Sequence, residues 1–285
     1  MKDQELGTLL PPNALHYGYF VKAAIEVHKA LKNVLSPTQS QYPEFPAGYT
    51  LIANIHMTDF FDKIKLPVYF GFIAVEDANP SNIVIAIRGT QSPMEWWDDF
   101  QIAPTPYPFA QNAGKVVTGF LKLYESLKVS APGHIGNPIS LKETAASGLK
   151  EFGLSDYKQV VLIGHSLGSS LVTLYGLDIA DIGDKKVSIY TLASPCTGDH
   201  DFVKYYHSVV SRSFRIFNEP DIVPKSLLLL GYSHVPFGFE VNSLLDPEVP
   251  QSIGAYHSIN TYLYLLGAPE DILNSNTVAA AEALS

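Results

Sequence analysis

Cysteine is almost absent from this chain, which has one, Cys196, among 285 residues. A single thiol excludes an intramolecular disulfide and a cysteine-based zinc site, and a free cysteine is most often buried. Charge is also scarce, since Lys, Arg, Asp and Glu make up 16% of the chain against about a quarter in an average soluble domain. This composition fits either an apolar surface suited to greasy substrates or a large core beneath a neutral polar surface.

Basic residues are outnumbered by acidic ones. The chain has 19 Lys and Arg against 28 Asp and Glu, and its longest basic cluster is the pair Lys185-Lys186. A net charge of −9 repels nucleic acid, which we therefore exclude as a partner. Apolar runs stay shorter than the roughly 18 residues of a membrane span, and the N-terminus lacks the apolar stretch of a signal peptide. We expect a soluble protein.

Hydrophobic periodicity divides the chain into alternating strands and helices. Helical spacing of apolar residues recurs at 14–32, 116–128, 142–152, 169–179, 201–210 and 258–266. Apolar runs typical of buried strands lie at 68–75, 83–87, 159–163, 187–192 and 214–217, and 232–241 resembles a strand or hairpin. This alternation predicts an α/β fold with a mostly parallel central sheet and helices on both faces. Because no polar linker interrupts the chain, we expect one domain over residues 1–285.

The strongest chemical signal is a glycine-flanked serine between the strand at 159–163 and the helix that follows. The pentapeptide is Gly164-His165-Ser166-Leu167-Gly168. A nucleophile elbow needs a sharp strand-to-helix turn with the serine at its apex. Glycines suit such a turn because a β-carbon there would collide with neighbouring backbone. Ser166 is therefore the expected nucleophile, although the five letters alone are a weak signal.

A serine nucleophile needs a base and an acid, and in this architecture they follow in the order serine, acid, histidine. Asp221 comes just after the predicted strand at 214–217 and is the preferred acid, with Glu219 as competitor. His257 opens the last predicted helix and is the preferred base. Of the other downstream histidines, His207 precedes Asp221, and strand alternation explains His234 as structural.

Two donors are needed to stabilise a tetrahedral oxyanion, and each is typically worth about 10²–10³ in rate. We expect the first to be the backbone amide of Leu167, directly after the nucleophile. The second is expected after an early strand, where Thr90 ends the run Ile87-Arg88-Gly89-Thr90. Metal and cofactor motifs such as a P-loop are missing, and the proposed chemistry needs neither kind of group.

Together these motifs resemble the class 3 lipases, the fungal-type triacylglycerol lipases of the α/β-hydrolase fold. The resemblance runs from about Tyr69 to Leu266. The motifs that carry it are Ile85-Ala86-Ile87-Arg88-Gly89-Thr90, Trp96-x-x-Asp99, Thr118-Gly119-Phe120, the serine pentapeptide, Asp221-Ile222-Val223-Pro224 and His257-Ser258-Ile259-Asn260-Thr261-Tyr262.

The resemblance implies further roles. Ser166, Asp221 and His257 would be the triad, with Thr90 and Leu167 as the oxyanion hole. Asp99 would accept a hydrogen bond from the oxyanion-hole hydroxyl. Residues 91–100 would be a short amphipathic helical lid that opens at a lipid–water interface. Its apolar members would be Met94, Trp96 and Trp97.

Some family features are missing from this chain. The family often has a histidine where Val117 stands, and fungal members have disulfides that a single cysteine cannot form. These departures suggest a bacterial or leaderless relative and leave localisation open between a secreted mature form and a cytoplasmic protein.

The expected function is that of a serine-dependent carboxylic ester hydrolase, a lipase that cleaves acylglycerols through an acyl-enzyme on Ser166. Its partners would be an ester or lipid substrate and a transient lipid–water interface, without a stable protein partner. The leucines at 227–230 would either line the acyl groove or belong to the core. Alternatives are a feruloyl or short-chain carboxylesterase, a phospholipase A1, or an inactive hydrolase fold that binds lipid. The last would require a broken triad.

Overall fold

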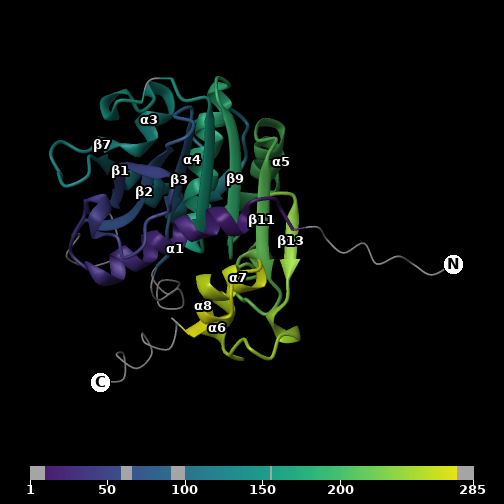
Figure 1. The fold of residues 1–285 in the computed structure, drawn as a ribbon. Coiled ribbons are helices and arrows are strands. Elements are labelled where there is room, and N and C mark those ends of the chain that lie inside the picture. Colours follow the sequence, from purple (N-terminus) through teal and green to yellow (C-terminus); the bar gives the residue numbers. More distant parts are fainter. Residues whose placement is uncertain (1–9, 59–65, 91–99, 155, 275–285) are drawn as a thin grey trace.

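A computed structural model describes residues 10–58, 66–90, 100–154 and 156–274. Within these ranges a main sheet runs in the order β13-β11-β9-β8-β3-β2-β1-β6-β7 (Figure 1). Its strands are β1 (Tyr49–Met57), β2 (Val68–Glu76), β3 (Asn82–Ile87), β6 (Leu127–Ser130), β7 (Ile139–Ser140), β8 (Gln159–His165), β9 (Lys186–Leu192), β11 (Ser213–Asn218) and β13 (Gly238–Val241).

One half of this sheet is parallel. Strands β3, β8, β9, β11 and β13 pair in the same direction, whereas β2, β1, β6 and β7 extend the sheet in antiparallel fashion. The parallel strands therefore all end at one edge, called here the carboxyl edge. Ligands of open α/β sheets bind at such an edge. The expected α/β fold is confirmed.

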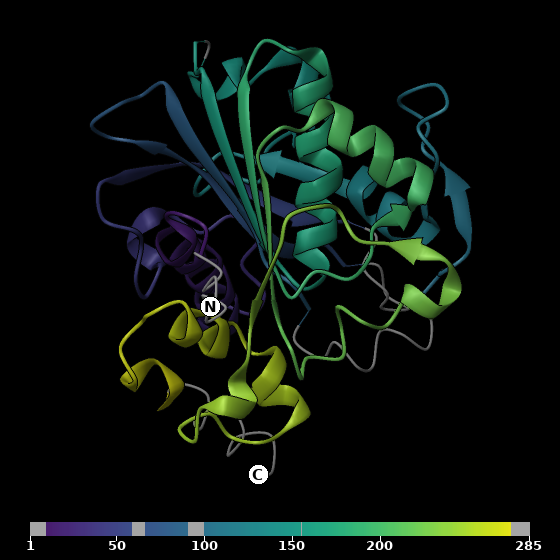
Figure 2. The same ribbon diagram turned by 90° about the vertical axis from the view of Figure 1, so that its right-hand side faces the viewer.

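Helices cover both faces of the sheet (Figure 2). Helices α1 and α7 lie on one face, and α2 to α5 lie on the other. None of the described helices is both long and apolar enough to cross a bilayer. Their bounds are α1 (Ala14–Ala30), α2 (Thr118–Ser126), α3 (Leu141–Ser147), α4 (Leu167–Ile182), α5 (His200–Val209), α6 (Ile253–His257), α7 (Ile259–Leu265) and α8 (Asp271–Asn274), with 3₁₀ turns η1 (Gln39–Gln41), η2 (Lys150–Phe152), η3 (Leu228–Leu230) and η4 (Ser243–Leu245).

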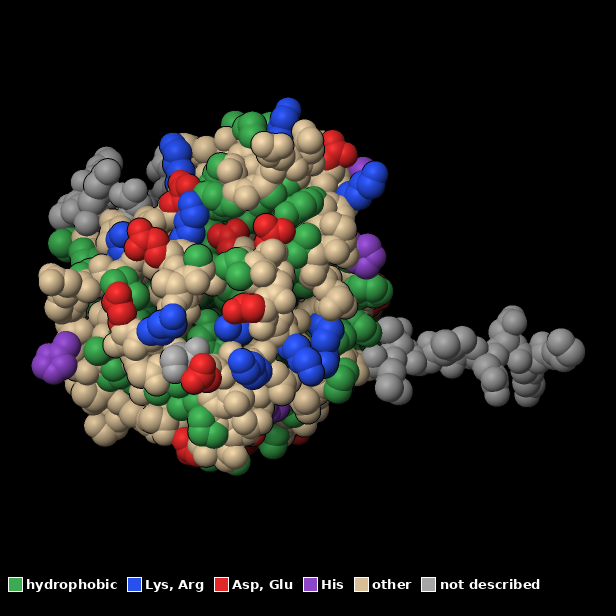
Figure 3. Space-filling model, turned by 90° about the horizontal axis from the view of Figure 1, so that it is seen from above, with side chains coloured by type: hydrophobic (Ala, Val, Ile, Leu, Met, Phe, Trp, Pro, Cys, Tyr) green, Lys and Arg blue, Asp and Glu red, His purple; other side chains and the backbone are tan. Residues whose placement is uncertain are grey.

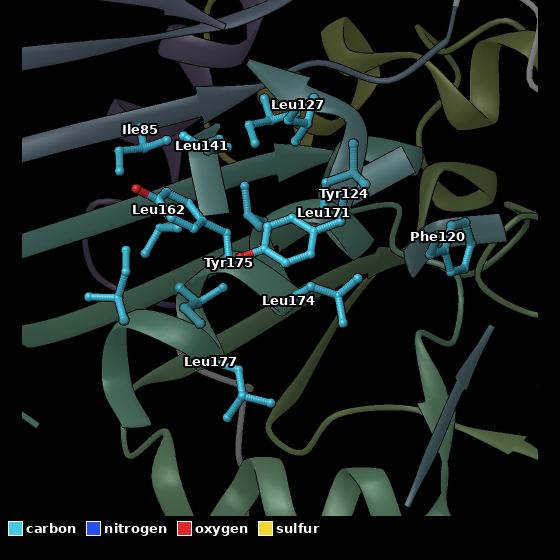
Figure 4. Close-up of a cluster of buried hydrophobic side chains, with 14 of the residues drawn as sticks. Ile85, Phe120, Tyr124, Leu127, Leu141, Leu162, Leu171, Leu174, Tyr175 and Leu177 are labelled. Carbon is cyan, nitrogen blue, oxygen red and sulfur yellow. The ribbon is translucent and has the colours of Figure 1, made fainter. Parts of the chain in front are cut away.

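Each central strand contributes side chains to two hydrophobic clusters. In β3, Ile83 and Ile85 belong to the cluster beneath α2 to α4, whereas Val84 and Ala86 belong to the cluster beneath α1. Successive side chains of a strand point to opposite faces, so a strand that is covered twice is apolar at every position. Figure 4 shows the first cluster, in which Leu171 and Tyr175 of α4 lie over the sheet.

A smaller sheet lies beside the carboxyl edge, in the order β12-β10-β5-β4. Its strands are β4 (Pro104–Pro106), β5 (Lys115–Val117), β10 (Gly198–Asp199) and β12 (Tyr232–Ser233). Asp199 caps α5 by accepting a hydrogen bond from the Phe202 amide at 2.9 Å. Cys196 is free and buried, as expected.

The strand β1 escaped the sequence prediction. It carries Asn54 and His56 at buried positions, so its apolar pattern is broken. Polar groups of distant segments satisfy Asn54, whose amide donates to the Pro37 carbonyl at 2.9 Å and accepts from the Tyr42 hydroxyl at 2.9 Å. The burial of a polar strand residue therefore depends on contacts that the local pattern does not contain.

Three predicted elements have different limits. The helix expected at 116–128 begins and ends in strand, because β5 and β6 take its first and last two residues. The helix expected at 142–152 ends at Ser147, where Gly148 has a φ of 71°. The strand or hairpin expected at 232–241 is neither, since β12 and β13 belong to different sheets. Phe237, with a φ of 60°, bends the chain between them.

Candidate active site

Ser166 occupies a sharp turn between β8 and α4. Its backbone has φ 56° and ψ −128°, a conformation that non-glycine residues rarely adopt. The flanking glycines make this turn sterically possible. A β-carbon on Gly164 would lie 2.4 Å from the Gly168 carbonyl oxygen, and one on Gly168 would lie 2.2 Å from the Ile87 carbonyl oxygen. The predicted elbow is therefore present, at the carboxyl edge of the sheet.

Two hydrogen bonds connect Ser166 to His257 and Asp221. The distance from Ser166 Oγ to His257 Nε2 is 2.8 Å, and that from His257 Nδ1 to Asp221 Oδ2 is also 2.8 Å. A carboxylate only accepts hydrogen bonds, so Nδ1 carries the imidazole proton and Nε2 accepts from the serine hydroxyl. The structure thus brings together the three residues that chain order had selected.

Asp221 is 1% exposed, and both of its carboxylate oxygens have partners. Its Oδ1 accepts from the Val223 amide at 3.0 Å. Its Oδ2 accepts from His257 and also from the hydroxyl of Tyr262 at 2.8 Å. Hydrogen bonds to a carboxylate are roughly twice as strong as those between neutral groups. They also fix the direction in which the carboxylate faces the imidazole.

Tyr262, in the motif that begins at His257, contacts the candidate acid, a position that its sequence pattern did not predict. It lies on α7, fully buried, and its hydroxyl also accepts from the Asn218 backbone amide at 2.9 Å. Burial and the negative charge of Asp221 raise the pKa of Tyr262 well above its usual value. The hydroxyl therefore stays protonated and donates to Asp221. Its spacing of five residues from His257 was the available signal.

Asn218 holds the segment that precedes the histidine. Its side-chain amide donates to the Tyr256 carbonyl at 2.9 Å and to Ser243 Oγ at 2.8 Å. Its carbonyl oxygen accepts from the Ser243 amide at 2.9 Å. Because Asn218 ends β11, these bonds tie α6 and η4 to the main sheet. The base is thus positioned against the sheet that carries the acid.

His165 is buried beside the base. Its Nε2 donates to the His257 carbonyl oxygen at 2.8 Å, and the two ring centroids are 4.9 Å apart. Burial, with a smaller contribution from His257, lowers the pKa of His165 to about 3. The ring is therefore neutral and acts as a hydrogen-bonded support.

Two segments beside Ser166 carry the expected oxyanion donors. Leu167 is the first residue of α4, where backbone amides have no acceptor inside the helix. Thr90 follows β3 and Gly89, and a β-carbon on Gly89 would lie 2.7 Å from the Ser166 β-carbon. The Thr90 hydroxyl is buried and has no hydrogen-bond partner among the described residues. A buried hydroxyl with this position beside a serine nucleophile is one that an oxyanion would satisfy.

Comparison with known proteins identifies the family of the chain. A family profile described as lipase (class 3) matches residues 84–230, which is more than half of the chain. The chain belongs to the class 3 lipase family.

Solved lipases share its fold. The triacylglyceride lipase of Rhizomucor miehei is 26% identical, with a TM-score of 0.58 over 80% of this chain and 79% of that one. A second structure, described as a triacylglycerol lipase with a serine protease triad as its catalytic centre, is 23% identical, with a TM-score of 0.60 over the same shares. These likenesses confirm the α/β-hydrolase fold.

Several curated relatives of this chain are plant phospholipases A1. Phospholipase A1-II 3 of Oryza sativa subsp. indica is 29% identical over 71% of this chain and 54% of its own length. Phospholipase A1-IIalpha of Arabidopsis thaliana is 28% identical over 79% of this chain and 63% of its own length. The chain spans about half to three fifths of the length of these relatives.

The residues considered as alternatives for the acid and the base have other partners. Glu219 accepts from Lys225 at 2.9 Å on the surface. His234 donates from Nε2 to the Pro224 carbonyl at 2.8 Å, and burial lowers its pKa to about 4. His207 lies on α5, with its ring 5.5 Å from Phe237. These three side chains are therefore engaged away from the relay of Ser166.

Most residues expected to form the lid lie outside the described part of the chain. This applies to Met94, Trp96 and Trp97, and to Asp99. The last residue of the expected segment, Phe100, is described and is 5% exposed. Its ring packs on Phe120 with centroids 4.7 Å apart and faces Gly119, where a β-carbon would lie 2.5 Å from it. Gly119 and Phe120 of the Thr118-Gly119-Phe120 motif therefore pack against Phe100.

The neutral state of His165 predicts a pH-dependent stability. Its pKa is about 3 in the folded protein, against 6.5 for an unperturbed histidine, so the unfolded chain binds more protons between these values. Its contribution is complete above pH 6.5 and is lost as the pH falls, at about 1.4 kcal/mol per pH unit. Urea unfolding at several pH values should show a shallower acid-side loss in His165→Asn than in the unchanged protein. The exposed His134→Asn is the control, and equal slopes in all three proteins would contradict the assignment.

Proposed function

We propose that this chain hydrolyses the acyl esters of lipids, with Ser166 as nucleophile, His257 as base and Asp221 as the acid that orients it. The observation that carries the proposal is the pair of 2.8 Å hydrogen bonds from Ser166 through His257 to Asp221. The strained elbow supports it, since such backbone strain is concentrated at functional sites. An inactive lipid-binding protein would have a broken triad, whereas in this chain all three proposed triad residues are present and hydrogen-bonded.

Acyl transfer follows in two halves. As Ser166 Oγ attacks the ester carbonyl carbon, His257 Nε2 takes the serine proton. The negative charge on the carbonyl oxygen is stabilised by the two expected donors, the Leu167 amide and the Thr90 hydroxyl. His257 then protonates the leaving alcohol, and the acyl group stays on the serine. A water molecule repeats the sequence and releases the carboxylic acid.

Acylglycerols are the substrates that we propose first. The structural likeness to triacylglycerol lipases supports this choice, together with the low charge of the chain. A specific observation favours phospholipase A1 activity as the second candidate, since the curated relatives named above are phospholipases A1. Both substrates present an acyl ester of a glycerol hydroxyl, so one catalytic relay serves either. We also propose that residues 1–285 act as one domain, because both hydrophobic clusters share a single sheet.

Covalent labelling tests the nucleophile. A fluorophosphonate probe should label the protein once, and Ser166→Ala should abolish both labelling and ester hydrolysis because it removes the hydroxyl that is aligned with His257. The rate of ester hydrolysis should fall by about 10⁶-fold relative to the unchanged protein, as for a nucleophile that acts together with its base and acid. The matched control is Ser169→Ala, a buried serine of α4 three residues further along the chain. Labelling that persists in Ser166→Ala would refute the assignment.

Tyr262 is expected to act as a positioning residue. Tyr262→Phe removes the hydrogen bond to Asp221 Oδ2. We expect kcat on a soluble ester to fall about tenfold or more with KM unchanged, because a bond to a charged group is lost away from the substrate. Tyr264→Phe is the matched control, since that hydroxyl donates to Asp246 at 3.0 Å from the same helix.

Thermal unfolding of both tyrosine variants separates positioning from stability. The Asn218 amide also loses its acceptor in Tyr262→Phe, so some loss of stability is expected. A fall in kcat at temperatures where the variant is fully folded supports positioning. An unchanged kcat in the folded variant would contradict it.

The two substrate classes are separated by their headgroups. Emulsified triacylglycerol and phosphatidylcholine vesicles of the same acyl chain should both be cleaved, with triacylglycerol cleaved faster. Released fatty acid is titrated, with Ser166→Ala as the blank. If phosphatidylcholine is cleaved faster, the phospholipase candidate replaces the lipase proposal. Activity confined to short soluble esters would refute both.

A further inference from the structure

Arg88 is a buried cation close to the candidate site. Lysines and arginines usually stay at the surface, and Figure 3 shows them interspersed with acidic side chains at the end of the molecule opposite the carboxyl edge. Arg88 is 3% exposed, and within the described ranges it is the only buried lysine or arginine. Burial lowers the pKa of Arg88 to about 9, which leaves the side chain charged at neutral pH. This charge lies directly after β3, shortly before Thr90.

The guanidinium of Arg88 is held by two carbonyl oxygens and one aromatic ring. Its Nε donates to the Tyr69 carbonyl oxygen at 2.9 Å, and its Nη1 donates to the Gly89 carbonyl oxygen at 2.6 Å. The guanidinium carbon lies 4.4 Å from the centre of the Phe70 ring, a cation–π contact. Tyr69 and Phe70 belong to β2, which pairs with β1 and β3. The side chain therefore ties the Gly89 carbonyl to the main sheet.

Gly89 depends on this tie because it has no strand partner. The ladder stops at Arg88, whose amide donates to the Phe70 carbonyl at 2.9 Å, and among the described residues Gly89 and Thr90 make no backbone-to-backbone hydrogen bond. A β-carbon on Gly89 would lie 2.7 Å from the Ser166 β-carbon, so no larger residue fits beside the nucleophile. Glycine has the greatest backbone freedom of all residues. The space that Ser166 needs is thus obtained with a residue that has to be restrained by its neighbours.

The hydrogen bond from Arg88 restrains the peptide group between Gly89 and Thr90. A peptide group is planar, and this one is trans. Fixing the Gly89 carbonyl oxygen therefore fixes the direction of the Thr90 amide, which points the opposite way, and the place of the α-carbon from which the Thr90 hydroxyl projects. A charged donor on the carbonyl oxygen also polarises the peptide group, because hydrogen bonds in a chain strengthen one another.

We propose that Arg88 is a positioning residue, which holds the Gly89–Thr90 peptide so that Thr90 stabilises the oxyanion without rearrangement. The inference rests on the proposed function and deepens it, because it names the group that restrains the second donor. Donors stabilise a transition state best when they are placed in advance, and a misplacement of about 1 Å can cost about 10²-fold in rate. Arg88 acts through Thr90 rather than on the substrate, so its effect should appear in kcat and leave KM unchanged.

Two replacements of the guanidinium test this role. Arg88→Met keeps an unbranched stem but removes both hydrogen bonds, so kcat on p-nitrophenyl butyrate should fall between about tenfold and a hundredfold with KM unchanged. Arg88→Lys keeps a charged donor without the planar fork of the guanidinium. Its kcat should lie between those of Arg88→Met and the unchanged protein, about threefold or more below the latter.

Inhibition by phenylboronic acid separates positioning from a loss of stability. The boronic acid adds to Ser166 Oγ and forms a tetrahedral anion that resembles the transition state. Its inhibition constant should therefore rise in each variant by about the same factor as kcat falls. The matched control is Tyr42→Phe, which removes buried hydrogen bonds to Asn54 and to the Tyr69 hydroxyl and leaves the Tyr69 carbonyl in place. The control should unfold at a lower temperature but keep its kcat and its inhibition constant.

Three results would overturn the proposal. The first is an unchanged kcat in folded Arg88→Met, the second is a fall in kcat with an unchanged inhibition constant, and the third is an Arg88→Lys variant no faster than Arg88→Met. If Arg88→Met does not fold, the parallel change of kcat and inhibition constant in Arg88→Lys decides.

Fluorophosphonate labelling distinguishes failure of the proposed function from failure of this inference. If the unchanged protein is labelled at Ser166 but cleaves no ester, the proposed function fails. The labelling rates, which depend on the same oxyanion donors, still decide the role of Arg88, because they should fall in its variants and stay unchanged in Tyr42→Phe. A protein that is neither labelled nor active would refute both.

Discussion

The backbone conformation of Ser166 is the constraint on which the rest of the site depends. A positive φ at a non-glycine residue costs about 1–3 kcal/mol and persists only where the surroundings enforce it. Here the enforcement comes from strand register. Ile87 of β3 is paired with Gly164, and Leu192 of β9 is paired with His165 and accepts the Ser166 amide at 2.9 Å. Three parallel strands that end side by side therefore create the turn, and the hydroxyl projects beyond their edge.

The acid and the base are held to that edge by a buried polar network. Tyr262 bridges Asp221 and the Asn218 amide, and Asn218 in turn binds the segment before His257. Each polar group in the network is paired, which is the condition under which a buried polar cluster adds rigidity. The relay thus joins the end of β11 to α6 and α7, although these elements lie about forty residues apart in the chain. Its geometry is set before substrate arrives.

Local patterns were sufficient for part of this architecture. Gly164, Ser166 and Gly168 were sufficient to predict the elbow, because the steric need for glycine is local. The order of acid and base along the chain is typical of the α/β-hydrolase fold, so chain order was sufficient to select Asp221 and His257. The strand at Tyr49–Met57 and the role of Tyr262 were missed because they depend on partners far away in sequence. The break between β12 and β13 depends on the conformation of Phe237, which no periodicity signals. The sequence therefore predicted the elbow and the order of the acid and the base more completely than the distant contacts that hold them.

The four leucines at 227–230 show why composition alone does not separate core from surface. A 3₁₀ turn has three residues per turn, so successive side chains point in three different directions. Leu227 is 1% exposed and anchors the segment in the larger cluster, whereas Leu229 is 97% exposed. Both alternatives weighed for this run were therefore incomplete, since one leucine is core and the next three form a projecting edge.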